Sequence, residues 1–239
     1  MSASPQESNS FADYLDWQNL ENKIIACRQC PRLVTWREEV ARTRRRAYKD
    51  QEYWGKPVTG FGDRVARILV VGLAPGAHGS NRTGRMFTGD ASGVFLYDAL
   101  YRSGFANQPG STSRQDGLVL KDVFISAVCR CAPPDNKPER VEIDNCQPYL
   151  LNEMYLLANI QGIVALGRVA FDQLIPIYKM KWGAAPAIEF GHAAFYPRRS
   201  QAPWLLASYH PSRQNTQTGR LTTEMFDRIW KLARENLSA

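Results

Sequence analysis

Two polar segments of the 239-residue chain carry the side chains that could do chemistry, and each follows a short apolar run. The first, residues 72–90 (GLAPGAHGSNRTGRMFTGD), contains His78 and Asp90 among several glycines. The second, residues 208–220 (SYHPSRQNTQTGR), contains His210. Histidine and carboxylate groups move or orient protons in enzymes, and glycines let a ligand approach the backbone closely. These segments therefore indicate a ligand site that carries acid–base groups.

The spacing of the glycines in the first segment excludes the two commonest phosphate-binding motifs. The chain has no G-x-x-x-x-G-K-S/T, so the lysine and the hydroxyl of a P-loop are missing. Its glycines after residue 71 do not follow G-x-G-x-x-G, the dinucleotide-binding pattern. The first segment therefore indicates a more particular kind of ligand.

The cysteines form a second candidate site, at positions 27, 30, 129, 131 and 146. The N-terminus has no apolar signal segment, so we expect the chain to stay inside the cell, where cysteines ligate metals more often than they form disulfides. The C-x-x-C pair at 27 and 30 fits either structural zinc or a four-cysteine iron–sulfur cluster. Cys129 and Cys131 would face the same side of a strand, so either fits as a third ligand.

The charge of the chain points to an anionic partner. The net charge is +7 and the pI is about 9.3, and part of the excess gathers in residues 42–49 (RTRRRAYK) and between 198 and 220. Such clusters beside a ligand loop favour a phosphate-bearing partner, which the charge alone leaves open as DNA, RNA or an anionic metabolite. No apolar run approaches the roughly 20 residues that span a bilayer, so we expect no membrane association.

Short apolar runs alternate with amphipathic segments along the chain. The runs predict four buried strands, at 68–71, 123–128, 163–166 and 204–208. The amphipathic segments predict helices at 93–102, from 138 onward, at 169–174 and at 221–237, with further helical segments at 11–26 and 33–48. This alternation predicts the α/β class, with helices on both faces of a mainly parallel four-stranded sheet.

The predicted topology brings the polar segments together. The loops after the first, second and fourth strands all leave carboxyl ends, which meet at one edge of a parallel sheet and form a usual place for a ligand site. We expect a single domain over residues 21–239, preceded by a partly disordered segment, 1–20.

Four segments together resemble the uracil-DNA glycosylase superfamily, most of all its family 5, whose members carry a 4Fe–4S cluster. Residues 72–90 and 208–220 resemble the two active-site motifs of that family. ACRQCPRL (26–33) and CAPPDNKP (131–138), together with Cys146, resemble its cluster segments. The similarity covers about residues 21–236. It implies a three-layer α/β/α sandwich and a monofunctional enzyme of base excision repair, which hydrolyses the N-glycosidic bond of a damaged base in DNA and leaves an abasic site.

The resemblance also implies roles for individual residues. Asp90, His210 and Asn136 match catalytic positions, where Asp90 would position water or stabilise the positive sugar and His210 would donate a hydrogen bond to the leaving base. Phe87 matches the aromatic residue that stacks on a flipped base. The other expected substrate contacts are Gly72, Leu73, Ala74, Pro75, Gly76, His78, Ser212, Arg213 and Gln214. The implied cluster ligands are Cys27, Cys30, Cys131 and Cys146, which leaves Cys129 as an extra cysteine.

Two positions depart from other branches of the superfamily. Leu73 stands where many members carry an acidic or polar residue that activates water. Ala127 stands where the related cluster-containing branch has an asparagine that reads the base. Loss of that amide weakens discrimination between bases. We therefore expect the enzyme to accept several deaminated bases, namely uracil and hypoxanthine, with xanthine and etheno-cytosine as further candidates.

Three alternatives stay open from the sequence. The chain fits a non-catalytic damaged-DNA-binding protein on the same fold, a covalent-trapping relative, or a zinc-stabilised hydrolase of nucleotides. The basic insertion of the trapping branch is not found after residues 72–90. The resemblance further implies a monomer in the cytoplasm of a prokaryote, associated with the nucleoid through DNA, and a replication clamp is a candidate partner.

Overall fold

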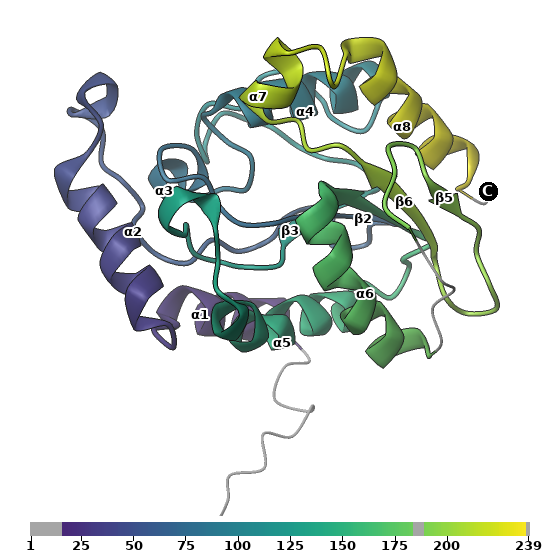
Figure 1. The fold of residues 1–239 in the computed structure, drawn as a ribbon, viewed down its shortest axis with the longest axis horizontal. Coiled ribbons are helices and arrows are strands. Elements are labelled where there is room, and N and C mark those ends of the chain that lie inside the picture. The colour runs from purple at the N-terminus through teal and green to yellow at the C-terminus, as the bar shows by residue number, and fades with distance from the viewer. Residues whose placement is uncertain (1–15, 184–188, 238–239) are drawn as a thin grey trace, which may run out of the picture.

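The computed structural model describes residues 16–183 and 189–237, and a six-stranded sheet runs through this part of the chain (Figure 1). The strand order is β1–β3–β2–β4–β6–β5. The four central strands are parallel and comprise β2 (Ile68–Gly72), β3 (Val123–Ala127), β4 (Gly162–Leu166) and β6 (Trp204–Ser208). The two edge strands pair antiparallel with their neighbours and comprise β1 (Phe61–Gly62) and β5 (Phe195–Tyr196).

The α/β class predicted from the sequence is confirmed, and the predicted strand number is wrong. The four expected strands are those in the centre of the sheet. The edge strands were not expected because each has only two residues, which is too short to show an alternating pattern.

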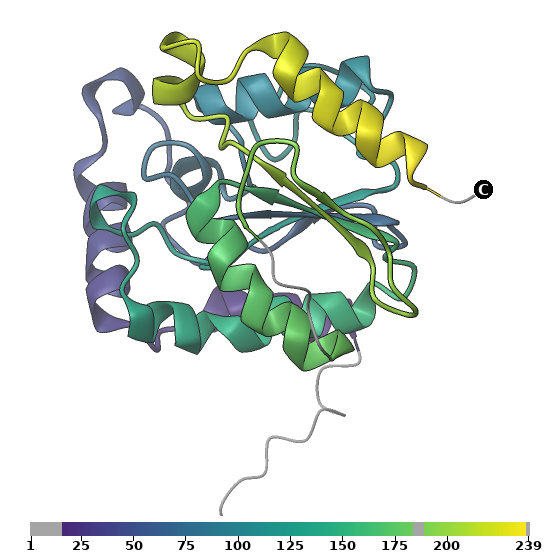
Figure 2. The same cartoon turned by 45° about the vertical axis from the view of Figure 1, so that its right-hand side comes forward.

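Helices cover both faces of the sheet, as Figures 1 and 2 show. These helices are α4 (Ala91–Arg102), α5 (Arg140–Leu156), α6 (Arg168–Trp182) and α8 (Thr223–Glu235). Successive strand residues point to opposite faces, so Ile68 and Val70 of β2 join the core beneath α4 and α8, while Leu69 and Val71 join the core beneath α5 and α6. Burial on both faces explains why the central strands are continuous apolar runs. The expected three-layer α/β/α arrangement is therefore present.

The N-terminal helices lie beside this sandwich. They are α1 (Trp17–Ala26), α2 (Pro31–Thr43) and the short 3₁₀ turn η2 (Arg46–Tyr48). α1 packs on α5 through Leu20, Ile24 and Tyr149. Residues 1–15 lie outside the described part of the chain, so only the end of the segment expected to be partly disordered is seen, and it is helical from Trp17.

Three helices differ by several residues from their predicted bounds. α2 ends at Thr43 rather than near residue 48, because Arg44 has φ +54° and the chain continues only as the short turn η2. α6 does not end near residue 174 but continues through Pro176 to Trp182, because Ile177 and Tyr178 extend its buried face and the Tyr178 hydroxyl donates to the carbonyl of Pro203 (2.8 Å). α5 begins at Arg140 rather than at 138, after a reciprocal cap between residues 139 and 142. Short helical turns that were not expected are α3 (Ser80–Thr83), η3 (Pro134–Asn136) and α7 (Arg213–Gln217).

The strand register places the loops that matter at one edge. Gly72 pairs with Ala127, and Leu166 pairs with Ser208, so the central strands end together. The loops after β2, β3 and β6 therefore leave from a common edge, as the topology predicted. Within the described residues, no helix is both long and apolar enough to cross a membrane.

Candidate active site

The loop after β2 folds back on its own strand and buries Phe87. A Cβ atom placed on Gly72 would lie only 2.9 Å from Cζ of the Phe87 ring. On the other side, a Cβ atom on Gly93 would lie 1.7 Å from the Phe87 carbonyl oxygen. Phe87 itself has φ +51°, which is uncommon for a bulky residue and is stabilised only by its surroundings. Glycine at 72 and 93 is therefore what allows the loop to present this ring at the sheet edge.

Asp90 ends the loop and also caps helix α4. Its Oδ1 accepts a hydrogen bond from the backbone N–H of Gly93 (2.9 Å). Its Oδ2 faces the start of the loop, since Cβ atoms on Gly76 and Gly79 would lie 3.1 and 1.9 Å from it. Burial raises the pKa of Asp90, against the opposing effect of the backbone N–H groups at the start of α4 and of Arg82. One oxygen is thus used in capping while the other faces the ligand loop.

His210 reaches the same region from the end of β6. Its ring centre lies 5.8 Å from that of Phe87, with 30° between the planes. Gly167, with φ +95° at the end of β4, leaves room for it, because a Cβ atom there would lie 3.1 Å from Cβ of His210. Burial lowers the pKa of His210 to about 4, so the imidazole is neutral at physiological pH and keeps one N–H to donate. The structure therefore brings Phe87 and His210 together from two distant segments.

Arg82, which the sequence patterns do not single out, braces the loop from within. Its Nε donates to the carbonyl of His78 (2.8 Å), its Nη2 to the carbonyl of Gly89 (2.7 Å) and its Nη1 to the side chain of Gln51 (2.5 Å). The side chain is buried, and hydrogen bonds to charged donors are stronger than those between neutral groups. Arg82 therefore holds the two halves of the loop in one conformation just before Asp90.

His78 turns toward the N-terminal part of the chain. The hydroxyl of Tyr53 lies 3.1 Å from Nδ1 of His78 and accepts a hydrogen bond from the backbone N–H of Arg45 (3.3 Å). Burial, together with the nearby Arg45 and Arg82, lowers the pKa of His78. His78 is thus linked to the segment after α2, a connection that the sequence did not reveal.

The backbone after β2 is tied to the segment after β3. The carbonyls of Gly72 and Leu73 accept hydrogen bonds from the N–H groups of Val128 (3.0 Å) and Cys129 (2.9 Å). These bonds continue the strand pairing beyond the sheet edge. Of the other predicted contacts in this loop, Pro75 is buried, whereas Leu73, Ala74 and Gly76 are partly exposed.

The remaining predicted residues lie on the outer side of the site. Ser212 caps α7, where its hydroxyl accepts a hydrogen bond from the backbone N–H of Asn215 (3.3 Å). Arg213 and Gln214 follow on the first turn of α7 and are exposed. Asn136 is also exposed, with φ +56°, and we find no hydrogen bond from its side chain to another described residue. No hydrogen bond or ring contact in the described part of the chain links Asn136 to Phe87 or His210, and its catalytic role stays a prediction.

Four cysteines line one cavity on the other side of the segment after β3. They are Cys27, Cys30, Cys131 and Cys146. The fifth, Cys129, is fully buried in the hydrophobic core beneath α5 and α6. Among the described residues, no group of three or more His, Cys, Asp or Glu side chains is arranged to hold a single metal ion. The cysteines thus surround a space rather than a point.

Two buried arginines also line the cysteine cavity. Arg37, 2% exposed, donates from Nη1 to Sγ of Cys131 (2.8 Å). Arg130, 1% exposed, forms an ion pair with the equally buried Glu153 (2.6 Å). In the described part of the chain, Nε of Arg37 and both Nε and Nη1 of Arg130 are buried without a hydrogen-bond partner. Buried donors of charged groups are costly when unpaired, so the cavity suits an anionic occupant.

Comparison with known families identifies the type of protein that carries this geometry. The family model described as the uracil DNA glycosylase superfamily matches residues 59–234, which include all six strands and both polar loops. The chain belongs to the uracil DNA glycosylase superfamily.

Individual relatives assign this superfamily member to one branch. The type-5 uracil-DNA glycosylase of Thermus thermophilus is 51% identical over 212 residues, covering 89% of this chain and 94% of the relative. The type-5 uracil-DNA glycosylase of Pyrobaculum aerophilum is 42% identical over 217 residues, covering 91% and 92%. A type-4 uracil-DNA glycosylase of the same organism is 30% identical over 164 residues, covering 68% and 66%. The chain therefore groups with the type-5 glycosylases, as its motifs predicted.

The sequence patterns of this superfamily member missed its buried arginines. Arg37 lies in a segment without a recognisable ligand motif. Arg82 lies within residues 72–90 and Arg130 lies between Cys129 and Cys131, but arginine is usually an exposed residue, so these patterns do not predict burial. One signal was available for Arg130, which stands between Cys129 and Cys131 just after the buried apolar run 123–128. For Arg37 and Arg82 only the tertiary structure shows the burial.

Proposed function

We propose that this protein hydrolyses the N-glycosidic bond of uracil in DNA and leaves an abasic site, as the first step of base excision repair. The observation that carries the proposal is the convergence of Phe87 and His210 beside the carboxylate loop of Asp90 at one sheet edge. The names of the type-5 relatives support it, because they are uracil-DNA glycosylases at 42–51% identity.

Each of the three residues suits a different part of this reaction. A base must leave the helical stack before its glycosidic bond can be reached, and the Phe87 ring offers a face on which the flipped base stacks. Cleavage places negative charge on the base, and the neutral imidazole of His210 donates a hydrogen bond to a base carbonyl as that charge grows. Asp90, with a carboxylate oxygen directed at the loop, orients water or stabilises the positive sugar.

The test of this function is uracil release from a duplex with one G·U pair, measured as strand cleavage by alkali at the abasic product. The wild-type protein should give the cleaved product, and Asp90→Asn and His210→Ala should give far less. Wild-type protein that binds the duplex without any release of uracil would favour the damaged-DNA-binding alternative. A protein–DNA adduct that survives denaturation would favour the covalent-trapping alternative.

We further propose that the pocket accepts deaminated bases beyond uracil, with hypoxanthine first and xanthine and etheno-cytosine as further candidates. Ala127 ends β3, next to Gly72, and is buried. An alanine methyl group there offers no hydrogen bond with which to select one base edge, so rejection of other bases rests on shape. Uracil and hypoxanthine released at rates within about tenfold of each other would agree with the proposal. Strict uracil specificity would contradict it, and Ala127→Asn should then leave specificity unchanged.

We also propose that the cysteine cavity holds a 4Fe–4S cluster, with Cys27, Cys30, Cys131 and Cys146 as its ligands. The fit rests on the four thiols that line the cavity and on the buried, partly unpaired guanidinium groups of Arg37 and Arg130, which suit an anionic group. When bound, the cluster would have a structural role, because its ligands would connect α2, the segment after β3 and α5.

Iron analysis separates the cluster ligands from the extra cysteine. Wild-type protein should contain about four iron atoms per chain and show iron–sulfur absorption in the visible range. Cys146→Ala should lose both, whereas Cys129→Ala should keep them, because Cys146 lines the cavity and Cys129 does not. Zinc in place of iron would contradict the cluster assignment.

A further inference from the structure

A second groove adjoins the active-site loop and is not used by the mechanism above. It has a volume of about 620 Å³, within the range of ligand sites. Three segments line it: the loop 51–56, the loop residues Arg82 and Thr83, and the turn 112–115. Arg82 lines the groove on the side of the active site, since its guanidinium also donates to the carbonyl of Gly89, next to Asp90.

The groove is lined by cations that lack carboxylate partners. Lys56 and Arg114 are exposed, and neither forms an ion pair within the described part of the chain. Instead, Lys56 Nζ lies 5.4 Å and Arg114 Cζ lies 4.5 Å from the centre of the Trp54 ring. A Trp ring attracts cations without neutralising them, so it holds the two positive charges near each other. One carboxylate, that of the exposed Glu52, also lines the groove.

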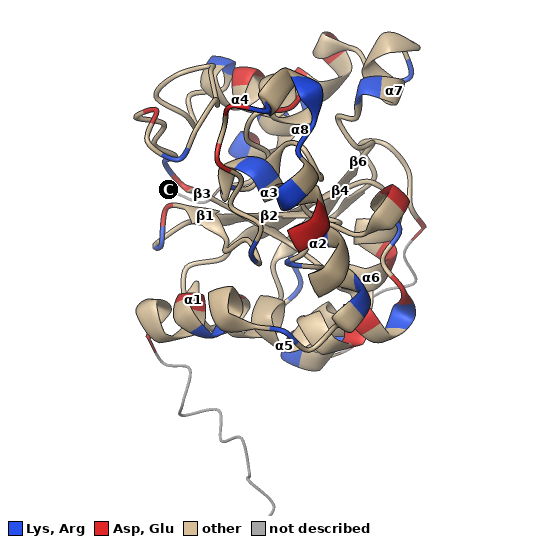
Figure 3. Cartoon of the chain, turned by 90° about the vertical axis from the view of Figure 1, so that its left-hand side faces the viewer, with Lys and Arg blue, Asp and Glu red and all other residues tan. Residues whose placement is uncertain are grey.

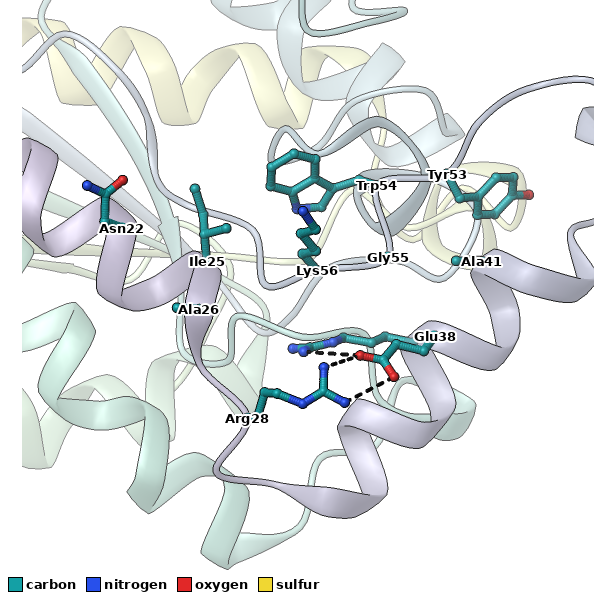
Figure 4. Close-up of a pocket in the computed structure, with 11 residues that line it drawn as sticks. Asn22, Ile25, Ala26, Arg28, Glu38, Ala41, Tyr53, Trp54, Gly55 and Lys56 are labelled. Carbon is teal, nitrogen blue, oxygen red and sulfur yellow. Dashed lines mark hydrogen bonds and ion pairs between the residues drawn. The ribbon is translucent and has the colours of Figure 1, made fainter.

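The loop that carries Trp54 is itself firmly placed. Trp54 Nε1 donates to the carbonyl of Pro57 (3.0 Å), and the backbone N–H of Trp54 donates to the carbonyl of Arg82 (2.9 Å). Figure 4 views this loop from its other side, where Lys56 extends toward the Trp54 ring above the paired Arg28 and Glu38. Arg28 thus has a carboxylate partner, whereas Lys56 has none among residues 16–183 and 189–237.

Positive charge continues from the groove to the end of α2. Arg44, Arg45 and Arg46 are exposed and likewise form no ion pair with a described carboxylate. They are connected to the active-site loop, because the backbone N–H of Arg45 donates to the Tyr53 hydroxyl, which contacts His78. Figure 3 shows the side of the molecule that carries α2, α3 and α7, with Lys and Arg segments in blue.

We infer that this groove, with Lys56 and Arg114 held at Trp54, binds backbone phosphates of the DNA strand that carries the lesion, beside the flipped nucleotide. Phosphates are contacted by unpaired lysine and arginine side chains, and such contacts position the protein on DNA without reading the sequence. Because Arg82 lines the groove and also binds the carbonyl of Gly89, next to Asp90, a strand with its lesion in the active site would continue into the groove. The inference rests on the proposed action on DNA but not on hydrolysis.

The experiment measures the salt dependence of binding to a duplex with a tetrahydrofuran abasic analogue, which the protein cannot cleave. The variant is Lys56→Gln/Arg114→Gln. Its control is Lys179→Gln/Lys231→Gln, which removes the same charge from exposed sites near the ends of α6 and α8. The end of α6 lies near the start of β6, away from the carboxyl ends of the strands that carry the active-site loops, since the Tyr178 hydroxyl donates to the carbonyl of Pro203.

The binding constant falls as salt rises, and each phosphate contact contributes about 0.9 to the steepness of log K against log salt. Loss of two contacts should therefore make this dependence shallower by about 1.8. Affinity at low salt should fall roughly tenfold, and the control should match wild-type protein. Uracil release at saturating DNA should stay within about twofold of wild type, because the reacting groups are untouched. A slope and an affinity equal to those of the control would overturn the inference.

Further measurements separate this inference from the proposed function and from damage to the fold. Lys56→Gln alone leaves the Arg114 contact with Trp54 and should lower the slope by about 0.9. If the wild-type protein releases no uracil but the double variant still lowers the slope, the groove stands and the hydrolytic function fails. If wild type releases uracil and the slope does not change, only the groove inference fails.

Discussion

The active-site edge and the cysteine cavity lie on either side of the segment after β3 and are built in opposite ways. At the active site, glycines let backbone and side chains approach closely, and the key groups are a neutral histidine and a carboxylate with one uncommitted oxygen. In the cysteine cavity, the long charged side chains of Arg37 and Arg130 are buried, and some of their guanidinium N–H groups lack hydrogen-bond partners among the described residues. The first region is shaped for a ligand that arrives and leaves, while the second is shaped for an occupant that stays.

The largest effect should come from Asp90→Asn. The amide still caps α4, because asparagine is as good an N-cap as aspartate, but it cannot accept a proton from water or offset positive charge on the sugar. We expect single-turnover uracil release to fall by about 10²–10⁴-fold, with the midpoint of thermal unfolding close to that of wild type. A lower midpoint of thermal unfolding together with the slower release of uracil would show that Asp90 acts mainly as the cap of α4.

Gly79→Ala tests whether close approach at the active site matters. Its Cβ atom would lie 1.9 Å from Oδ2 of Asp90, so the carboxylate must move. We expect roughly a 10²-fold slower release of uracil, the usual result of displacing a reacting group by about 1 Å. Gly110→Ala is the matched control, since no atom lies within 4 Å of a Cβ at that position, and it should retain wild-type activity.

Arg37→Met tests the opposite design in the cysteine cavity. The change keeps most of the buried volume but removes the hydrogen bond to Cys131 and the buried positive charge. We expect a loss of about 1–3 kcal/mol in the free energy of unfolding, measured by thermal denaturation of the iron-loaded protein. Arg28→Met is the control, because its ion pair with Glu38 is exposed to solvent and such pairs contribute little to stability. Equal losses in the two variants would refute the role of the buried charge.

The smallest effect concerns pH. The pKa of His210 is about 4 in the folded protein and about 6.5 in an unfolded chain, so the unfolded state binds the proton more readily. The stability contributed by neutral His210 is therefore complete above pH 6.5 and is lost as pH falls toward 4. The decrease in the unfolding midpoint between pH 7 and pH 5 should be larger in wild type than in His210→Gln. Identical decreases would show that His210 is not buried as a neutral group.

Much of the fold was predictable because its signals are local. The central strands are uninterrupted apolar runs, and their alternation with amphipathic segments is enough to predict the parallel sheet. The two-residue edge strands and the continuation of α6 through Pro176 were not predictable, because they depend on pairing and burial that only neighbouring segments supply. For Asn136 the motif position predicts a role, and the structure shows only that its side chain is exposed, so that role stays a prediction.

The sequence by itself determined the family, the two polar loops and the edge of the sheet from which they leave, because motif spacing and strand order are properties of the chain. Only the tertiary structure decided which groups meet there. It set Phe87 against His210, directed one oxygen of Asp90 at Gly79, placed Arg37 beside Cys131 and brought Lys56 and Arg114 to the Trp54 ring. These contacts join residues far apart in sequence, and the burial that lowers the pKa of His210 exists only when the chain is folded.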